Sequence, residues 1–546
     1  MNTHTQPSTR LLSLSIPALV AAALWAPAPA GAQQIPWIGL AANGAQLLGE
    51  VGTGHNSPGA EDHFGFAVAA GDFNGDGFDD LASGIPGNDC DFVVWDCGSV
   101  QVRFGREVAP LLPWGVLNPV DNPNEPAEAS EENGYALATG DFNNDGHADL
   151  AVGVPGDRTD HPANAFGGSA HIHYGLPVAE GGIQWLPEHI LRENDTLPDP
   201  PGSGSPQSFD LGKALAVGDF NGDGHDDLAI GDPQYWIAGQ AGGVWVAHGH
   251  VGGLVPFEGF LMRQGLDGLP DVPEAGDQFG HALAAGDFND DGFDDLAIGV
   301  PQEDGVGAVL VVYGSPFSLI FSNHWWFGHF DLGLAPQPGS RFGAALAVGD
   351  VDGDGHDDLA VSAPKWDGLA AEDIGLLTVL YGTPSGLTPQ LGTWLWEDVL
   401  YGAGNSEAFD DFGRALAAGD FDGNGVDDLA IGIAGENNAL ADSGAVAVVL
   451  GRPGQALPGA ARPLRPGPAP NPVGLIPDVE SGQPFYGSAL AAGDFDGNGF
   501  DDLAIGAPGR DVPGAANAGG VAVVYGQLFA DGFEAGSAGA WSSASP

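Results

Sequence analysis

Basic residues are scarce in this chain. Its 546 residues include 14 Lys and Arg against 73 Asp and Glu, so the formal net charge is −59. Binding to nucleic acid needs a basic patch that displaces counterions from phosphates, and binding to an anionic membrane surface needs the same kind of patch. The charge balance therefore argues against both partners.

Cysteines and long apolar runs are also few. After a polar start with one base, Leu11 to Trp25 is largely apolar, and small residues follow up to Ala32. This pattern predicts a secretory signal peptide over residues 1–32, with a membrane anchor as the alternative reading. Secretion implies an oxidising compartment, so we expect Cys90 and Cys97 to form one local disulfide. There is no CxxC motif.

Catalytic signatures are missing as well. No Ser/His/Asp spacing, nucleophile elbow or HExxH motif stands out. Helical 3.6-residue periodicity is not sustained anywhere, whereas the chain holds 90 Gly, 43 Pro and 43% hydrophobic residues. An acidic disordered chain is poor in apolar residues, so this composition favours an all-β protein with many tight turns.

One acidic string recurs along the chain. It reads Gly-Asp-Phe-Asn-Gly-Asp-Gly-Phe-Asp-Asp-Leu-Ala at residues 71–82, and its copies lie about 70 residues apart on average. Self-similarity at a fixed period is typical of repeat architectures. The first Asp of each copy falls at Asp72, Asp141, Asp219, Asp287, Asp350, Asp420 and Asp494.

Each copy sits in a unit of the same plan. An aromatic-Gly start leads into a run of Ala, Gly and Val, and the acidic loop and a second apolar run follow. A β-branched run such as 309–313 comes next, and the unit ends in a looser segment that often contains Trp. These are four short strands separated by Gly/Pro turns, and four strands repeated seven times predict a seven-bladed, all-β propeller.

The composition of the strands and the two ends of the chain fit a closed ring. The small residues of each first strand, as in Ala282 to Gly286, suit the crowded propeller axis. The seventh unit lacks a full fourth strand, while an extra segment near 37–51 precedes the first unit. Because a propeller leaves no open edge, we expect the N-terminal segment to supply the outer strand of the last blade.

The acidic loop has the pattern of a cation site. Counted from its first Asp, oxygen-bearing side chains recur at positions 1, 3, 5 and 9, and Gly occupies position 6 in every copy. Hard, all-oxygen ligation suits Ca²⁺, and the position-7 carbonyl can join it. We therefore predict about seven structural Ca²⁺ ions. The expected ligands are Asp72, Asn74, Asp76, Phe78, Asp80, Asp141, Asn143, Asp145, His147, Asp149, Asp219, Asn221, Asp223, His225, Asp227, Asp287, Asn289, Asp291, Phe293, Asp295, Asp350, Asp352, Asp354, His356, Asp358, Asp420, Asp422, Asn424, Val426, Asp428, Asp494, Asp496, Asn498, Phe500 and Asp502.

Two other interpretations of the loop agree less well with its residues. It is not an EF-hand, because position 12 carries Ser, Val or Ile in place of the bidentate Glu and a strand follows. An ion-free Asp/Asn/Gly turn is the simpler alternative. Seven copies of the same ligand pattern argue against it, because carboxylates crowded without a cation repel one another.

The complete unit resembles the FG-GAP repeat of integrin α-subunit propellers. The resemblance rests on Phe-Gly…Gly-Asp-(Phe/Val)-(Asn/Asp)-x-(Asp/Asn)-Gly-x-x-Asp-Leu-Ala-x-Gly-x-Pro and covers about residues 36–526. It implies that the calcium loops join the first and second strands on one face and that ligands bind on the other. The chain departs from that family in having the ion pattern in every blade. Residues 33–526 are expected to form the propeller, and 527–546 a disordered tail or sorting tag.

The resemblance implies a binding role. We expect a secreted, monomeric module at the cell surface, outside the cell or in the periplasm, that binds a protein or glycan through the loops opposite the calcium face. A polysaccharide hydrolase or lyase and a passive surface scaffold are the alternatives. Aromatic residues in the loops between second and third strands are the candidate contacts: Trp95, Phe166, Tyr235, Trp236 and Trp366.

Overall fold

Twenty-eight strands build seven four-stranded antiparallel sheets. The structure is a computed structural model, and apart from these strands it contains a short helix, α2 (Glu397–Tyr401), and the 3₁₀ turn η3 (Glu303–Gly305) among the residues it describes. Those residues are 45–49, 60–89, 97–107, 111–117, 131–157, 167–177, 182–184, 187, 189–192, 210–235, 241–265, 268–368, 371–401, 406–436, 443–457, 461–464, 484–512 and 515–526.

The sheets are the blades of a propeller, numbered here along the chain. Blade 1 is β2 (Val68–Gly71), β3 (Asp80–Ile85), β4 (Ser99–Phe104) and β5 (Leu112–Leu117); blade 2 is β6 (Ala136–Gly140), β7 (Asp149–Val154), β8 (Ser169–His173) and β9 (His189–Leu191). Blade 3 is β10 (Ala214–Gly218), β11 (Asp227–Asp232), β12 (Gly243–His248) and β13 (Val255–Met262); blade 4 is β14 (Ala282–Gly286), β15 (Asp295–Val300), β16 (Ala308–Val312) and β17 (His324–Phe327). Blade 5 is β18 (Leu346–Gly349), β19 (Asp358–Ala363), β20 (Leu376–Tyr381) and β21 (Thr388–Leu395); blade 6 is β22 (Phe412–Gly419), β23 (Asp428–Ile433), β24 (Ala445–Val449) and β25 (Ala461–Leu464). Blade 7 is β26 (Ala489–Gly493), β27 (Asp502–Gly506), β28 (Val521–Val524) and β1 (Ala45–Leu48).

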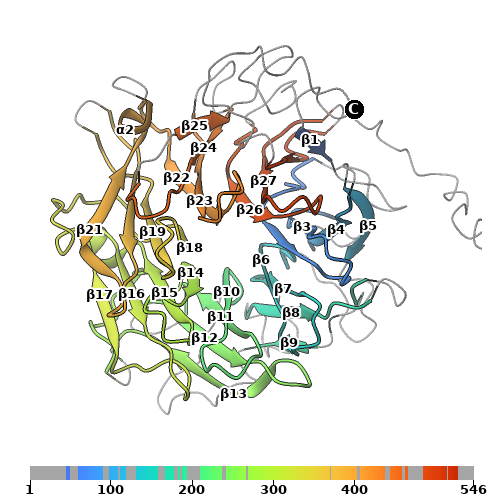
Figure 1. The fold of residues 1–546 in the computed structure, drawn as a ribbon, viewed down its shortest axis with the longest axis horizontal. Helices are drawn as coiled ribbons and strands as arrows, with labels where there is room; N and C mark the ends of the chain where they lie inside the picture. Colours follow the sequence, from blue (N-terminus) through green and yellow to red (C-terminus); the bar gives the residue numbers. More distant parts are fainter. Residues whose placement is uncertain are drawn as a thin grey trace, which may run out of the picture.

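The first strand of each blade lies innermost and contacts the first strands of both neighbouring blades, and β26 contacts β2, so the ring is closed (Figure 1). The closure uses the N-terminal segment as predicted. β1 pairs antiparallel with β28, with Ala45 opposite Val524 and Leu48 opposite Val521. Blade 7 therefore combines the two ends of the described chain. Its third strand, β28, is paired on both sides, as the third strands of the other blades are.

The core lies between neighbouring sheets. Phe73, at position 2 of the first acidic loop, is fully buried among side chains of blades 1 and 2, including Val102 and Val152. The inner strands stay small because they approach closely: a Cβ on Gly140 would lie 2.4 Å from Val217 Cγ1. The predicted Ala/Gly/Val composition of the axis is thus a packing requirement.

A row of hydrogen bonds joins adjacent blades next to the axis. At position 8 of the loop an Asp side chain accepts the backbone N–H of position 1 in the preceding blade, as Asp294 Oδ2 does from Asp219 N at 2.8 Å. Burial raises the pKa of the Asp294 carboxyl, and neighbouring carboxylates including Asp219 raise it further. Six junctions share this bond, which we call the position-8 latch; its acceptors are Asp79, Asp226, Asp294, Asp357, Asp427 and Asp501. The junction of blades 1 and 2 has Ala148 at this position.

Removing one latch should destabilise the ring measurably. We expect Asp294→Ala to lower the free energy of unfolding by about 1–2 kcal/mol, because the half-buried N–H of Asp219 loses its acceptor. Asp294→Asn keeps an acceptor oxygen without the charge and should cost clearly less. Urea unfolding of both variants measures the difference. Equal stability of the two variants would show that the latch contributes nothing, since Ala is sterically accepted at the Ala148 junction.

Candidate metal centres

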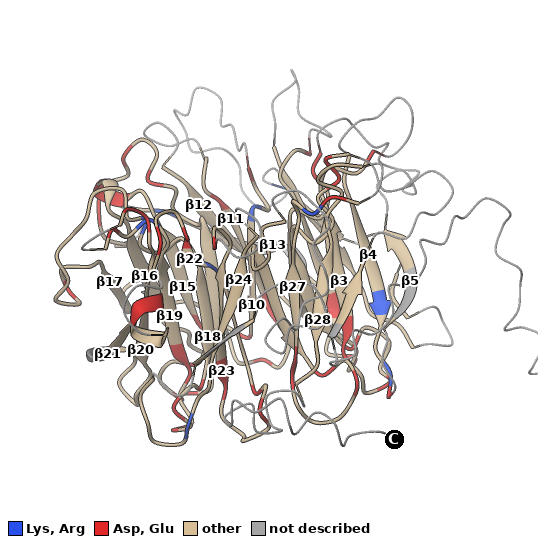
Figure 2. Ribbon diagram, turned by 90° about the horizontal axis from the view of Figure 1, so that it is seen from above, with Lys and Arg blue, Asp and Glu red and all other residues tan. Residues whose placement is uncertain are grey.

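Each acidic loop joins the first and second strands of its blade, so all seven lie at the same end of the strands. The connections between second and third strands, and from one blade to the next, lie at the other end, which we call the opposite face. Acidic residues gather in the loops at both ends (Figure 2). The glycine at position 6 adopts the predicted left-handed conformation, with φ of 87° at Gly77 and 84° at Gly499. Position 4 is left-handed as well, with φ of 69° at Gly75 and 54° at Asn144, which the sequence analysis missed.

The carboxylate at position 1 closes the turn. Asp72 Oδ1 accepts the N–H of Asp76 at 3.1 Å, and Asp72 Oδ2 accepts the N–H of Gly77 at 2.8 Å. The same two bonds recur in every loop, for example at 2.9 and 2.7 Å onto Asp420. One carboxylate therefore holds the curled backbone that turns alternate side chains inward.

The carboxylate at position 9 ties the loop to the rest of the blade. Asp80 opens β3, is fully buried, and accepts N–H bonds from Phe73 at 3.2 Å and from Gly105 at 2.9 Å. Gly105 follows the third strand, and a Cβ there would lie 2.2 Å from the carbonyl oxygen of Asp79. Only glycine fits such an approach, which explains the glycine after every third strand. The N–H of that glycine donates to position 9 in all seven blades.

In three loops the side chain at position 3 presents a buried oxygen without a protein partner. Asn74 Nδ2 donates to Asp80 Oδ2 at 3.0 Å, so its Oδ1 points elsewhere. That Oδ1 is buried and has no hydrogen-bond partner, and the same holds for Asn143 Oδ1 and Asp352 Oδ1. A buried acceptor without a donor is costly in a protein, and a cation would satisfy it.

Three carboxylates converge in the loops of blades 5, 6 and 7. The residues at positions 1, 3 and 9 place one oxygen each within 4.8 Å of one another. Position 5 is Asn in blades 6 and 7; in blade 5 it is Asp354, whose Oδ1 accepts the N–H of His356 at 3.0 Å and lies 3.0 Å from His356 Nδ1. Position 5 and the carbonyl of position 7 therefore remain predicted ligands. The converging sets are Asp350, Asp352 and Asp358; Asp420, Asp422 and Asp428; and Asp494, Asp496 and Asp502.

The electrostatics of position 9 favour a bound cation. Burial, together with the neighbouring loop carboxylates, raises the pKa of the position-9 carboxyl to about 8 in six of the seven loops. In the remaining loop, that of blade 3, burial also raises the pKa of Asp227, while His248, whose Nδ1 lies 3.0 Å from Asp227 Oδ2, lowers it. A divalent cation among these oxygens would stabilise their ionised forms. The orphaned oxygens and the all-oxygen donor set fit Ca²⁺.

Two of the five aromatic residues that were predicted to contact a ligand are among the described residues. Tyr235 is 4% exposed and its ring packs edge-on against Trp245, with centroids 6.2 Å apart, so its expected exposure is wrong. Trp366 is half-buried, with its ring 4.8 Å from that of His329. Both occupy the third residue after a second strand, and that residue points in between blades. Trp95, Phe166 and Trp236 lie outside the described residues.

Exposed apolar side chains occur instead on the connections between blades. Phe330, Val272 and Phe409 are 80%, 70% and 56% exposed, and Val399 in α2 is 40% exposed. These connections lie on the opposite face, where the sequence analysis expected binding aromatics. Phe317, at 92%, lies between β16 and β17 and hence on the face of the acidic loops.

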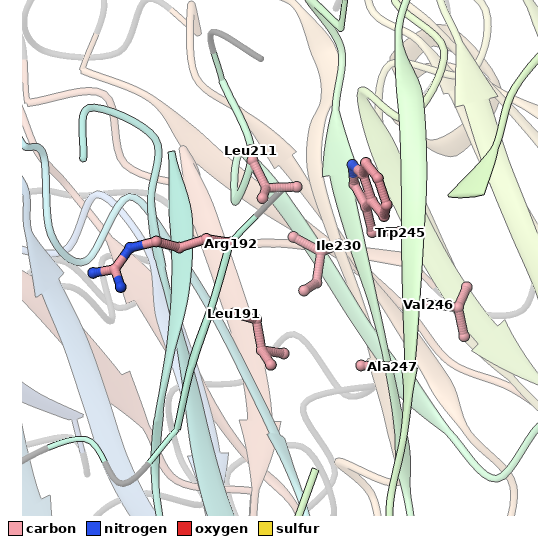
Figure 3. A pocket seen from close by; sticks show the side chains of 7 residues that line it. All are labelled: Leu191, Arg192, Leu211, Ile230, Trp245, Val246 and Ala247. Carbon is pink, nitrogen blue, oxygen red and sulfur yellow. The ribbon is translucent and has the colours of Figure 1, made fainter. Parts of the chain in front are cut away.

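A small cavity separates the outer parts of blades 2 and 3. Its volume is about 10 Å³, which is room for about one water molecule and not for a sugar ring. Figure 3 shows that the guanidinium of Arg192 points away from the apolar side chains, and its Nε lies 3.3 Å from Asp157 Oδ2. The cavity is therefore packing space. Its lining is Leu191, Arg192, Leu211, Ile230, Trp245, Val246 and Ala247.

Several predictions concern residues 1–32, 90 and 527–546, which lie outside the described residues. The signal peptide and the tail therefore stay predictions. Cys97 is fully buried, and its disulfide to Cys90 also stays a prediction. None of the helices in the described part of the chain has the length and apolarity that a membrane span requires.

Comparison with known proteins gives consistent results. A family model described as FG-GAP repeat matches residues 64–100, 133–173, 211–246, 279–312, 342–380, 412–449 and 486–524. Phosphatidylinositol-glycan-specific phospholipase D of Rattus norvegicus is 35% identical over 185 residues, which are 32% of this chain and 21% of that protein. Integrin alpha-PS2 of Drosophila melanogaster is 31% identical over 271 residues (47% and 17%), and integrin alpha-5 of Xenopus laevis is 30% identical over 246 residues (43% and 20%). The matched parts span about a fifth of each relative.

Proposed function

Because this chain is a seven-bladed β-propeller of FG-GAP repeats that resembles the integrin α-subunits, we propose that it is a secreted, calcium-stabilised binding module. Calcium would occupy the acidic loops, and a protein ligand would contact the opposite face. The observation that carries the calcium part is the buried, partnerless oxygen at position 3, seen at Asn74, Asn143 and Asp352.

The residues at positions 1, 3 and 9 would hold each ion, joined by position 5 and the carbonyl of position 7. A bound Ca²⁺ would neutralise the carboxylates that crowd the loop. The chain's own part is to fix these oxygens: position 1 shapes the turn, and position 9 anchors the loop to the glycine after the third strand. The ions would thereby rigidify one end of every blade and leave the opposite face to carry the ligand.

The binding part is supported by the exposed apolar side chains of the opposite face. Large exposed aromatics are typical anchors of protein interfaces, whereas single exposed apolar residues are also common on any surface. Similarity to integrin α-subunits favours a protein ligand over a glycan. Two observations disfavour an enzyme role: no catalytic motif stands out in the sequence, and among the described residues the cavity of blades 2 and 3 is too small for a sugar ring. The activity named for the phospholipase D relatives is not assigned to this chain.

A paired-face experiment tests the binding proposal. The purified protein is measured by surface plasmon resonance against a panel of extracellular proteins and polysaccharides in the presence of calcium. For a ligand so found, Phe330→Ser/Phe409→Ser is expected to weaken the affinity at least about tenfold, because truncating interface anchors costs more than about 1 kcal/mol each. Phe317→Ser, on the face of the acidic loops, is the matched control and should bind like the wild type.

Three results would contradict the proposal. Equal binding by all three proteins would remove the opposite face from consideration. A panel without any ligand would favour a passive scaffold, and turnover of a polysaccharide would favour the enzyme.

A further inference from the structure

Three buried carboxylates meet on the opposite face at the junction of blades 5 and 6, far along each blade from the acidic loops. Glu397 opens α2 after β21, Asp410 precedes β22, and Glu436 lies in the connection from β23 to β24. Glu397 and Asp410 are fully buried and Glu436 is 4% exposed. One oxygen from each lies within 4.8 Å of the other two.

We propose that Glu397, Asp410 and Glu436 bind a divalent cation, Ca²⁺, at a site separate from the seven loops. The spacing fits this ion. Calcium–oxygen distances are about 2.3–2.6 Å, so two ligands of one ion can lie up to about 5 Å apart. Three carboxylates can supply up to six oxygens, which reaches the coordination number of Ca²⁺.

Asp410 supplies an observation independent of the clustering. Its Oδ2 accepts the N–H of Glu407, while its Oδ1 is buried and has no hydrogen-bond partner. No Lys, Arg or His of the described residues forms an ion pair with Asp410. Burial raises the pKa of Asp410, hydrogen bonding with the Glu407 N–H and the Glu397 side chain lowers it, and the carboxylates of Glu407 and Asp411 raise it. An acceptor oxygen that is fully desolvated and faces two more carboxylates calls for a cation.

The corresponding positions at other junctions show that the fold does not demand three acids. Between blades 3 and 4 the set is Gln264, Asp277 and Glu303, and the Gln264 amide donates to Glu303 Oε2 at 2.6 Å. At this junction the neutral amide group of Gln264 donates a hydrogen bond to the buried carboxylate, whereas at the junction of blades 5 and 6 we assign that role to the cation.

Between blades 4 and 5 the equivalent residues are His329, Ser340 and Trp366. The rings of His329 and Trp366 pack with centroids 4.8 Å apart, and Ser340 Oγ donates to the carbonyl of Val306. No carboxylate occurs in this set. The all-acid set at the junction of blades 5 and 6 is therefore a feature of that junction alone among these three.

Counting bound calcium in matched variants tests the proposal. Full-length wild type, Asp410→Asn and the control Glu303→Gln are dialysed against the same calcium buffer, and bound calcium is measured by plasma mass spectrometry. Asp410→Asn is expected to hold about one ion fewer than the wild type, and Glu303→Gln the same number. Equal counts for wild type and Asp410→Asn would overturn the proposal in favour of carboxyl groups that share protons.

Melting curves keep the test valid if one variant folds poorly. In chelator, Asp410→Asn should melt no lower than the wild type, because it removes a buried negative charge; in calcium it should melt lower. Asp410→Ser, which copies Ser340 of the neighbouring junction, should behave alike, and identical calcium responses of all variants would overturn the proposal. If the seven loops bound no calcium, the site of Asp410 could still be tested separately. The wild type would then hold about one ion and Asp410→Asn none.

Discussion

Chelation of calcium is expected to lower the melting temperature of the protein by on the order of 20 °C. A ligand that binds only the folded state adds about 2.7 kcal/mol per site at a hundredfold excess over its dissociation constant. Seven loops together approach about 19 kcal/mol, and a chain of this size loses roughly 1 °C per kcal/mol. Differential scanning calorimetry in calcium and in chelator measures the shift.

The pH dependence separates calcium binding at the loops from a general salt effect. Without calcium, six position-9 carboxyls have a pKa of about 8 in the folded protein against a usual value of 3.8. Between these values the folded state holds protons that the unfolded chain has released, so stability in chelator should fall as the pH rises from about 4 to about 8. With calcium the ionised forms are the ligands, so the gap between the two melting temperatures should widen over the same range. A gap independent of pH would contradict this account.

Replacement of a single position-9 carboxylate should have the largest effect of any loop substitution. Asp428→Ala is expected to lower the free energy of unfolding by about 3–5 kcal/mol. The fully buried Asp428 accepts N–H bonds from Gly451 at 2.8 Å and from Asp422 at 3.2 Å. Both donors lose their acceptor, and the loop of blade 6 loses an ion ligand. Guanidinium unfolding in excess calcium measures the loss.

The chain offers its own control for this substitution. The loops of blades 1 to 4 carry Asn at position 3 and Asp at position 5, and the loop of blade 5 carries Asp at both, so Asp352→Asn reproduces a natural ligand set and should cost less than about 1 kcal/mol. Comparable losses for Asp352→Asn and Asp428→Ala would show that the loop does not discriminate between its positions. Little loss for Asp428→Ala would mean that the junction of loop and third strand is held by other contacts.

The repeat made most of the fold predictable from the sequence. Seven copies of one pattern give the blade number, and the missing fourth strand of the last unit, together with the extra N-terminal segment, gives the closure that β1 and β28 make. The convergence of positions 1, 3 and 9 in the loops of blades 5, 6 and 7 could be predicted, because spacing within one tight loop fixes which side chains meet. These are local inferences, and local geometry follows from sequence most directly.

The features that the sequence analysis missed depend on contacts between segments far apart in the chain. The position-8 latch needs a neighbouring blade: Asp79 accepts the N–H of Asp494, which lies 415 residues further along the chain. The sequence places Tyr235 in a loop, where an aromatic residue can be exposed, but its side chain is buried between two blades. The acidic cluster at the junction of blades 5 and 6 is built from segments that are separated in the chain, so no sequence motif predicts it. Its members are Glu397, Asp410 and Glu436.

The acidity of the chain is partly explained by these positions. The predicted ligands of the loops account for many of the carboxylates, and the six latch residues give a structural role to further acids that are not predicted to bind an ion. Most of the remaining acids have no such role, and 14 bases cannot neutralise them. A net negative surface of this kind keeps a protein soluble and repels other anions.

The number of calcium ions bound per chain tests the central claim most directly. Metal-free protein is dialysed against buffered calcium, and the bound ion is measured by plasma mass spectrometry against protein concentration. The account predicts about seven ions in the loops, with about one more at the junction of blades 5 and 6. A folded protein that retains none, with a melting temperature indifferent to chelator, would contradict it.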